Sequence, residues 1–177
     1  MIPIRSALLI LCVAMLPTVL LAQGAEDNET DPFPQEKPVT YPAPPLDEHL
    51  SALYLGEAVS NRFSVDRKSV TVESNGEVRY TLVVISAGGV RSAAYEGIRC
   101  ETRELRRYAT LRNGTTWIPS RNLNWSRITE SPGHRQHAVL YLNFFCPNGI
   151  MVKDLAEALR NFARGGRSPL ENPLENY

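Results

Sequence analysis

The sequence predicts an α+β domain, in which one C-terminal helix covers an antiparallel β-sheet, preceded by a signal peptide and a proline-rich leader. Short alternating apolar segments between turn residues predict the sheet, and apolar residues at helical spacing near the C-terminus predict the helix. The chain has 177 residues and one long apolar run, at its N-terminus. This length accommodates one domain with appendages, which excludes a multi-span membrane protein and a large multidomain enzyme.

Residues 1–24 are predicted to be a signal peptide. Arg5 precedes an apolar run over residues 7–22, and small residues follow it. A basic start, an apolar middle and a small-residue exit are typical of a secretory signal. The run is shorter than the roughly 20 residues that span a bilayer, which favours cleavage after Ala22 or after Gly24 over the alternative of an uncleaved anchor.

Residues 25–45 are predicted to be an acidic linker. The segment carries six prolines among many acids, so it is expected to be an extended tether rather than part of a core. Residues 26–60 hold eight acids and one lysine, whereas residues 61–177 hold 17 basic side chains, 15 of them arginine, and 11 acids. A single basic domain is expected over residues 46–166, with a flexible tail at 167–177.

Two cysteines, Cys100 and Cys146, remain once the signal with Cys12 is removed. They are expected to form a disulfide, because thiols in an oxidising compartment generally pair. The alternative is two buried free thiols. Closing a loop of this length stabilises a fold by about 4 kcal/mol in the chain-entropy description. Neither cysteine has a CxxC neighbour, so a redox centre is not predicted.

The middle of the chain is predicted to be rich in β-structure. Asn75-Gly76 and Asn113-Gly114 favour type I′ hairpin turns. The segment 78–86 is apolar on both faces near its end, which predicts a central strand. The expected strands are residues 62–66, 69–73, 78–86, 90–102, 108–111, 116–118, 123–128 and 138–145.

Two further elements complete the expected fold. Residues 46–58 form either a short helix or an extended lead-in. Residues 152–163 form an amphipathic helix that ends at Gly165-Gly166, with Asn161 on its polar face. Cys146 continues the apolar face of the expected strand 138–145, and Cys100 ends the apolar face of the expected strand 90–102. The predicted disulfide therefore joins two strands.

Several short motifs occur in order along residues 45–163. They are VRYTLVVIS, YEGIRC at 95–100, Arg103-Glu104, Tyr108-Ala109, Trp117, Trp125 and FFCP at 144–147. This combination resembles the cryptic neisserial protein-like family, small exported proteins of Gram-negative bacteria without an assigned activity. The resemblance implies a periplasmic or envelope location and brings no catalytic residues with it.

Glu96 is the most unusual acid of the predicted sheet, since it precedes Gly97 within an apolar strand. A carboxylate among apolar side chains needs a partner, and the sequence offers Arg79, Arg91 or Arg99. Glu96 is then either an acid that contacts a ligand or half of a structural ion pair. The structural interpretation is favoured, because such pairs are common.

A basic cluster is predicted in the second half of the domain. It consists of Arg99, Arg103, Arg106, Arg107 and Arg112 with Tyr108, diluted by Glu101 and Glu104. Guanidinium groups bind phosphate and carboxylate groups well, so these side chains are candidate contacts for an anionic envelope component or another periplasmic protein. The alternative is a solvated face held by salt bridges.

The sequence favours a non-enzymatic binding or structural module over an enzyme. It contains no nucleophile motif and no P-loop. His134 and His137 lack further ligands at a telling spacing, so no metal or cofactor is predicted. The alternatives are a periplasmic cell-wall or carbohydrate hydrolase that uses Glu96 or Glu101, and a nucleic-acid-binding domain, which export disfavours.

Overall fold

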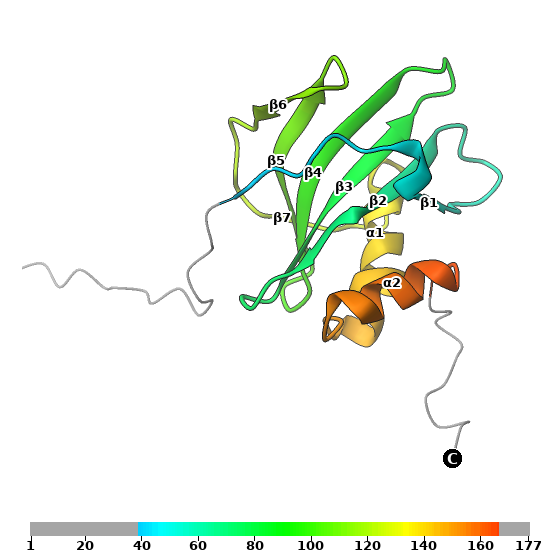
Figure 1. The fold of residues 1–177 in the computed structure, drawn as a ribbon. Helices are drawn as coiled ribbons and strands as arrows, with labels where there is room; N and C mark the ends of the chain where they lie inside the picture. Colours follow the sequence, from blue (N-terminus) through cyan, green and yellow to red (C-terminus); the bar gives the residue numbers. More distant parts are fainter. Residues whose placement is uncertain (1–38, 167–177) are drawn as a thin grey trace, which may run out of the picture. The chain divides into compact units, whose positions relative to one another are not determined.

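The computed structural model describes residues 39–166. Helices lie on one face of its sheet, and an extended N-terminal segment crosses the other face (Figure 1). The predicted signal peptide, the start of the linker and the tail lie outside the described residues. Within residues 39–166, no helix is both long enough and apolar enough to cross a membrane.

The sheet is antiparallel, which confirms the predicted α+β class. Its strands are β1 (Leu50–Leu53), β2 (Arg62–Val72), β3 (Glu77–Ile85), β4 (Arg91–Arg99), β5 (Glu104–Arg112), β6 (Thr116–Pro119) and β7 (Ser126–Arg127). They pair in the order β1-β2-β3-β4-β5-β6, and β7 pairs with β5 as well. The central strand β3 is buried on both faces along most of its length, as predicted.

The two Asn-Gly turns differ in type. Asn113 and Gly114 both have positive φ, 51° and 72°, which confirms the type I′ turn between β5 and β6. Between β2 and β3 only Gly76 has positive φ. The backbone N–H of Glu73 donates to the carbonyl of Glu77, so the loop has three residues. The predicted hairpin is therefore present, but its predicted turn type is wrong.

The start of the domain combines both expected alternatives. A short 3₁₀ turn, Asp47–His49, leads into strand β1, which pairs with β2. The two short strands expected at 62–66 and 69–73 form one strand with an irregularity between Asp66 and Thr71. There the hydroxyl of Ser69 donates to the carbonyl of Asp66 and accepts from the backbone N–H of Thr81. This side chain replaces the interrupted ladder hydrogen bonds.

The strand predicted at 138–145 is wrong, because this segment is helical. Helix α1 (Arg135–Val139) continues into a π-helical stretch, Leu140–Phe145. The segment is apolar at alternate positions and also at helical spacing, so its pattern fits both structures. In the fold, Leu140, Tyr141, Phe144 and Phe145 are buried, whereas Leu142 and Asn143 lie on the outer side. The ring of Phe145 packs against Tyr80 of β3, with centroids 5.0 Å apart.

Helix α2 (Leu155–Ala163) confirms the predicted C-terminal helix, with a later start. Asp154 caps it by accepting a hydrogen bond from the backbone N–H of Glu157 at 2.7 Å. Asn161, expected on the polar face, is buried and donates to the carbonyl of Phe144. Phe162 stacks on Phe144 with centroids 4.7 Å apart. The helical layer is therefore larger than the single helix predicted.

The predicted disulfide between Cys100 and Cys146 is present, with Cα atoms 5.5 Å apart. It joins the end of β4 to the end of the π-helical stretch, so it connects sheet to helix rather than strand to strand. The hydroxyl of Tyr141 donates to the carbonyl of Cys100 at 3.0 Å. The crosslink and this hydrogen bond hold the helical layer against the sheet.

The described end of the proline-rich linker packs on the sheet. The indole N–H of Trp117 donates to the carbonyl of Pro42 at 2.7 Å. The ring of Tyr41 lies 6.2 Å from the rings of both Tyr95 and Trp117. Arg91 donates to the carbonyl of Pro45. Pro42 and Pro45 have a fixed φ, which favours an extended backbone. Residues 39–45 therefore form an extended segment, called the strap below, which has few backbone hydrogen bonds of its own.

Replacing Cys100 by Ser should lower the free energy of unfolding by roughly 2–5 kcal/mol, because the unfolded chain loses its crosslink. At this size the melting temperature falls by about 10 °C. Thermal unfolding of the mature chain, followed by circular dichroism with and without reductant, measures the change. Equal melting of the oxidised and reduced wild-type chain would contradict the stabilising role of the bridge.

Candidate functional site

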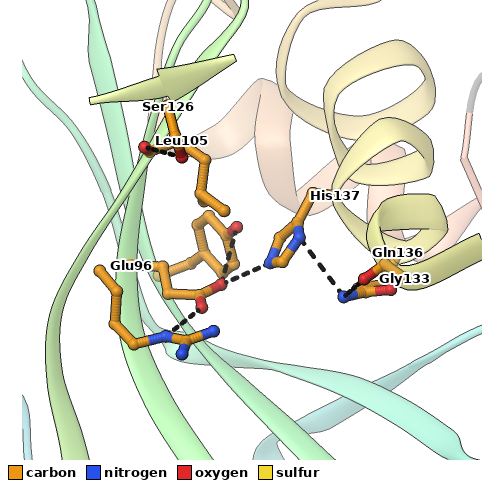
Figure 2. Close-up of polar contacts among 8 residues, drawn as sticks. Glu96, Leu105, Ser126, Gly133, Gln136 and His137 are labelled. Atoms are coloured by element: carbon orange, nitrogen blue, oxygen red, sulfur yellow. Dashed lines mark hydrogen bonds and ion pairs between the residues drawn. The ribbon is translucent and has the colours of Figure 1, made fainter. Parts of the chain in front are cut away.

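Glu96 is fully buried and forms the centre of a polar cluster on the helical side of the sheet. Figure 2 shows Glu96 on its strand pointing toward His137 of α1. The ring Nε2 of His137 lies 2.9 Å from Oε2 of Glu96, and the hydroxyl of Tyr80 donates to the same oxygen at 3.3 Å. Nε of Arg107 donates to Oε1 at 3.0 Å. Side chains from two strands, β3 and β5, and from helix α1 thus contact one carboxylate of β4.

The register of the sheet brings these side chains together. Tyr80 on β3 and Arg107 on β5 both pair with Glu96 on β4. The register between β4 and β5 shifts by one residue, because Ala109 pairs with Tyr95 while Arg107 pairs with Glu96. Tyr108 is the extra residue. Without this bulge, Arg107 would point to the opposite face, since side chains alternate along a strand.

The protonation states of Glu96 and Tyr80 follow from their burial and from the charges around them. Burial alone raises the pKa of Glu96, but the hydrogen bond from His137, the charge of His137 when protonated, and the Arg107 guanidinium together lower it below its ordinary value. Burial and the nearby Glu96 charge raise the pKa of Tyr80 well above its ordinary value. Glu96 is therefore ionised and Tyr80 is a neutral donor at neutral pH.

A cavity of about 190 Å³ adjoins the cluster. Side chains of β3, β4, β5 and α1 line it, among them Leu82, Val84, Ala94, Glu96, Arg107 and His137. The Arg107 side chain is 52 % exposed. Its Nε contacts Glu96, and its two terminal nitrogens make no hydrogen bond to the residues in 39–166. The cavity therefore has an anchored cation with an available donor edge.

A larger hollow of about 760 Å³ lies between the strap and the β5–β6 turn. Its arginine, Arg91, already donates to Asp47 and to the carbonyl of Pro45. The acids that line it, Asp47 and Glu48, have mostly exposed side chains. This hollow lacks a buried polar group that would hold a ligand in one orientation, so the cavity beside Glu96 is the better candidate.

The predicted partners of Glu96 are wrong. Arg79 pairs with Glu77 at 3.0 Å, Arg91 pairs with Asp47, and Arg99 lies over the ring of Trp125 at 4.3 Å. Arg79 and Arg99 occupy odd positions of β3 and β4, which face away from the helices, whereas Glu96 faces toward them. Glu96 forms an ion pair with Arg107 instead, and it also lines a cavity.

The predicted basic cluster is divided between the two faces of the sheet. Arg99 and Arg106 both lie over the ring of Trp125, each with its guanidinium carbon 4.3 Å from the ring centroid. Arg103 pairs with Glu130, and Arg112 is exposed at the far end of β5. Only Arg107 of this group lines the cavity beside Glu96.

Tyr108 and a second buried carboxylate, Glu77, form another cluster on the face away from the helices. The hydroxyl of Tyr108 donates to Oε1 of Glu77 at 2.5 Å, and Arg79 donates to Oε2 at 3.0 Å. A Cβ added at Gly97 would lie 2.0 Å from Oε1 of Glu77 and 3.0 Å from the Tyr108 ring. Gly97 is thus needed because the buried carboxylate lies directly over it.

Tyr80 and His137 both contact Glu96, and neither is predicted as a site residue from the sequence. His137 is assessed there only as a metal ligand together with His134. Among the described residues no group of three or more His, Cys, Asp or Glu could hold a metal ion. One sequence signal could have predicted that His137 is buried: it lies four and seven residues before Tyr141 and Phe144, which are buried. This spacing is informative only if the segment is recognised as a helix.

Replacing Glu96 by Gln should lower the free energy of unfolding by about 2–4 kcal/mol near pH 7, since Arg107 and His137 lose a charged partner. The folded pKa of Glu96 lies below its ordinary value of 4.5. The carboxylate therefore stabilises the fold fully above about pH 4.5, and this contribution is lost as pH falls through the folded pKa. Urea unfolding across this range should show the two proteins converging; a constant difference would contradict the assignment.

Replacing Gly97 by Ala should destabilise the domain by roughly 2–4 kcal/mol, because the buried Glu77–Tyr108 pair must move. Gly88→Ala is the matched control, since its Cβ would approach nothing closer than 3.9 Å. In a Glu77→Ala background the effect of Gly97→Ala should be smaller. Urea unfolding of the four variants measures this coupling, and strictly additive effects would disprove the proposed clash.

Comparison with known proteins supports one assignment. No curated protein and no solved structure matches the chain significantly. The model of one protein family matches residues 29–163, which is most of the chain and includes the entire sheet, α1 and α2. The chain belongs to the CNP1-like family.

Proposed function

We propose that this chain is an exported, non-enzymatic binding module of the cell envelope, which holds an anionic group of an envelope component through Arg107. The observation that carries the proposal is the available donor edge of Arg107 beside the cavity. Its other edge is occupied by Glu96, which is fully buried and cannot move away without losing its partners.

The attachment to Glu96 makes Arg107 a better ligand for an anion than a free surface arginine. A guanidinium is planar and presents its N–H groups as a fork that matches carboxylate and phosphate oxygens. The Nε contact fixes the plane of the fork before a ligand arrives. Binding then requires less ordering of a long side chain, which is a main penalty at surface sites.

The chemistry of Glu96 supports binding rather than acid catalysis. An ionised carboxylate whose two oxygens accept hydrogen bonds has no proton to donate. Hydrolysis of a glycosidic bond usually needs two carboxyl groups on either side of the substrate, and Glu96 is the sole acid among the residues that line this cavity. Glu101, the other candidate, is exposed in the turn after β4 and does not line it.

The location in the periplasm is part of the same proposal. The signal-like N-terminus provides the export route. The disulfide between Cys100 and Cys146 fits an oxidising compartment, where such bonds persist. Anionic groups are abundant there as lipid head groups, lipopolysaccharide phosphates and the carboxylates of cell-wall peptides.

Replacing Arg107 by Gln should weaken the binding of a simple anion at least fivefold, because the fork and its charge are lost. The measurement is an NMR titration of the mature, oxidised wild type and variants with sodium acetate and with inorganic phosphate. It is followed through the backbone N–H signals of Ala94, Glu96 and His137, which line the cavity and are kept in both variants. Arg106→Gln is the matched control, since it removes the same charge from the adjacent residue on the opposite face. Equal losses in both variants would reduce the effect to net charge and contradict the proposal.

A further inference from the structure

We propose that the cavity beside Glu96 binds a short-chain monocarboxylate, with its carboxylate on Arg107 and its aliphatic chain against Leu82, Val84 and Ala94. The inference rests on the proposed anion contact at Arg107 and adds the ligand class. The guanidinium by itself would bind any small anion. The lining residues, the volume and the net charge of the cavity restrict the class of anion that fits.

The cavity is lined by charged, apolar and a few neutral polar residues; the neutral polar ones are Ser92, Thr110 and Gln136. Leu82 and Val84 of β3 and Ala94 of β4 lie on the helical face of the sheet and line the cavity. Arg107 and His137 line it from β5 and from α1. A ligand that fills this space needs an acceptor group at one end and apolar atoms at the other.

The volume limits the ligand to a short chain. At roughly 30 Å³ for an atom with its share of space, a cavity of about 190 Å³ accommodates on the order of six non-hydrogen atoms. A carboxylate attached to three further carbons has this size. In a longer acid, the end of the aliphatic chain must extend out of the open side of the cavity, so the added carbons contribute little to affinity.

The net charge of the cluster favours a monoanion. Arg107 contributes one positive charge and Glu96 one negative charge. A bound monocarboxylate therefore adds a single negative charge to a pair that is neutral by itself. A dianionic phosphate would add a second negative charge next to the buried Glu96 carboxylate, which lies one guanidinium away.

Two sources present the same chemistry. One is a free short-chain acid, and the other is the C-terminal carboxylate of a peptide that ends in a small residue. Butyrate and N-acetylalanine distinguish them. In the second ligand the α-carbon and methyl group occupy the apolar side, and the amide leaves through the open side of the cavity.

The test is an NMR titration of the mature, oxidised chain with acetate, propionate, butyrate and hexanoate, with butyramide as the uncharged control. Affinity should rise about fourfold for each added methylene up to butyrate, because each buries about one CH₂, and hexanoate should bind no better than butyrate. Butyramide should bind at least tenfold more weakly. N-acetylalanine tighter than butyrate assigns the peptide end, and the reverse assigns the free acid.

Ala94→Leu supplies a second variant, since it fills the cavity and leaves the Glu96 cluster in place. It should abolish the preference for butyrate over acetate while acetate still binds. If acetate and phosphate bind at Arg107 but chain length has no effect in the wild type, the ligand class is wrong and the anion contact stands. If no anion perturbs Arg107, the proposed function fails together with this inference.

Discussion

The buried charge of Glu96 is the constraint on which the arrangement of the sheet and the helical layer depends. A carboxylate removed from water is tolerated only when donors satisfy it. Here those donors come from β3, β5 and α1, so the register of three strands and the position of one helix are linked through a single group. A slip of any of these elements would leave a charge buried without a partner, which is among the most destabilising changes in a protein.

The disulfide and the Glu96 cluster divide the task of holding the helices. Cys146 ends the π-helical stretch and is tied to the end of β4, while His137 reaches Glu96 from the preceding helix. The helical layer is thus attached to the sheet at two points, Cys146 and His137. Together they define both its position and its rotation on the sheet. The cavity lies beside the second of these points, between the sheet and α1, and its shape therefore depends on both.

Most of the sheet follows from the sequence because alternation, Asn-Gly turns and β-branched residues act locally. Residues 138–145 could not be assigned in this way, since their apolar positions satisfy a strand and a helix equally, and the buried contacts of Tyr141 and Phe145 decide between them. The partners of Glu96 were likewise beyond local reasoning. The bulge at Tyr108 places Arg107 on the helical face of the sheet. No spacing in the sequence predicts this change of face, although Gly97 within a strand indicates that the backbone next to Glu96 is unusual.

Within the described residues, several of the arginines that make the second half of the chain basic are not free surface charges. Arg79 and Arg91 are paired with acids, and Arg99 and Arg106 lie against Trp125. Each such contact either neutralises the charge or buries the face of the guanidinium against a ring. Arg107 differs because its acidic partner is buried behind it and occupies Nε alone. The paired acid therefore orients this arginine instead of covering it, which is why one guanidinium, rather than the total charge, carries the argument for an anion site.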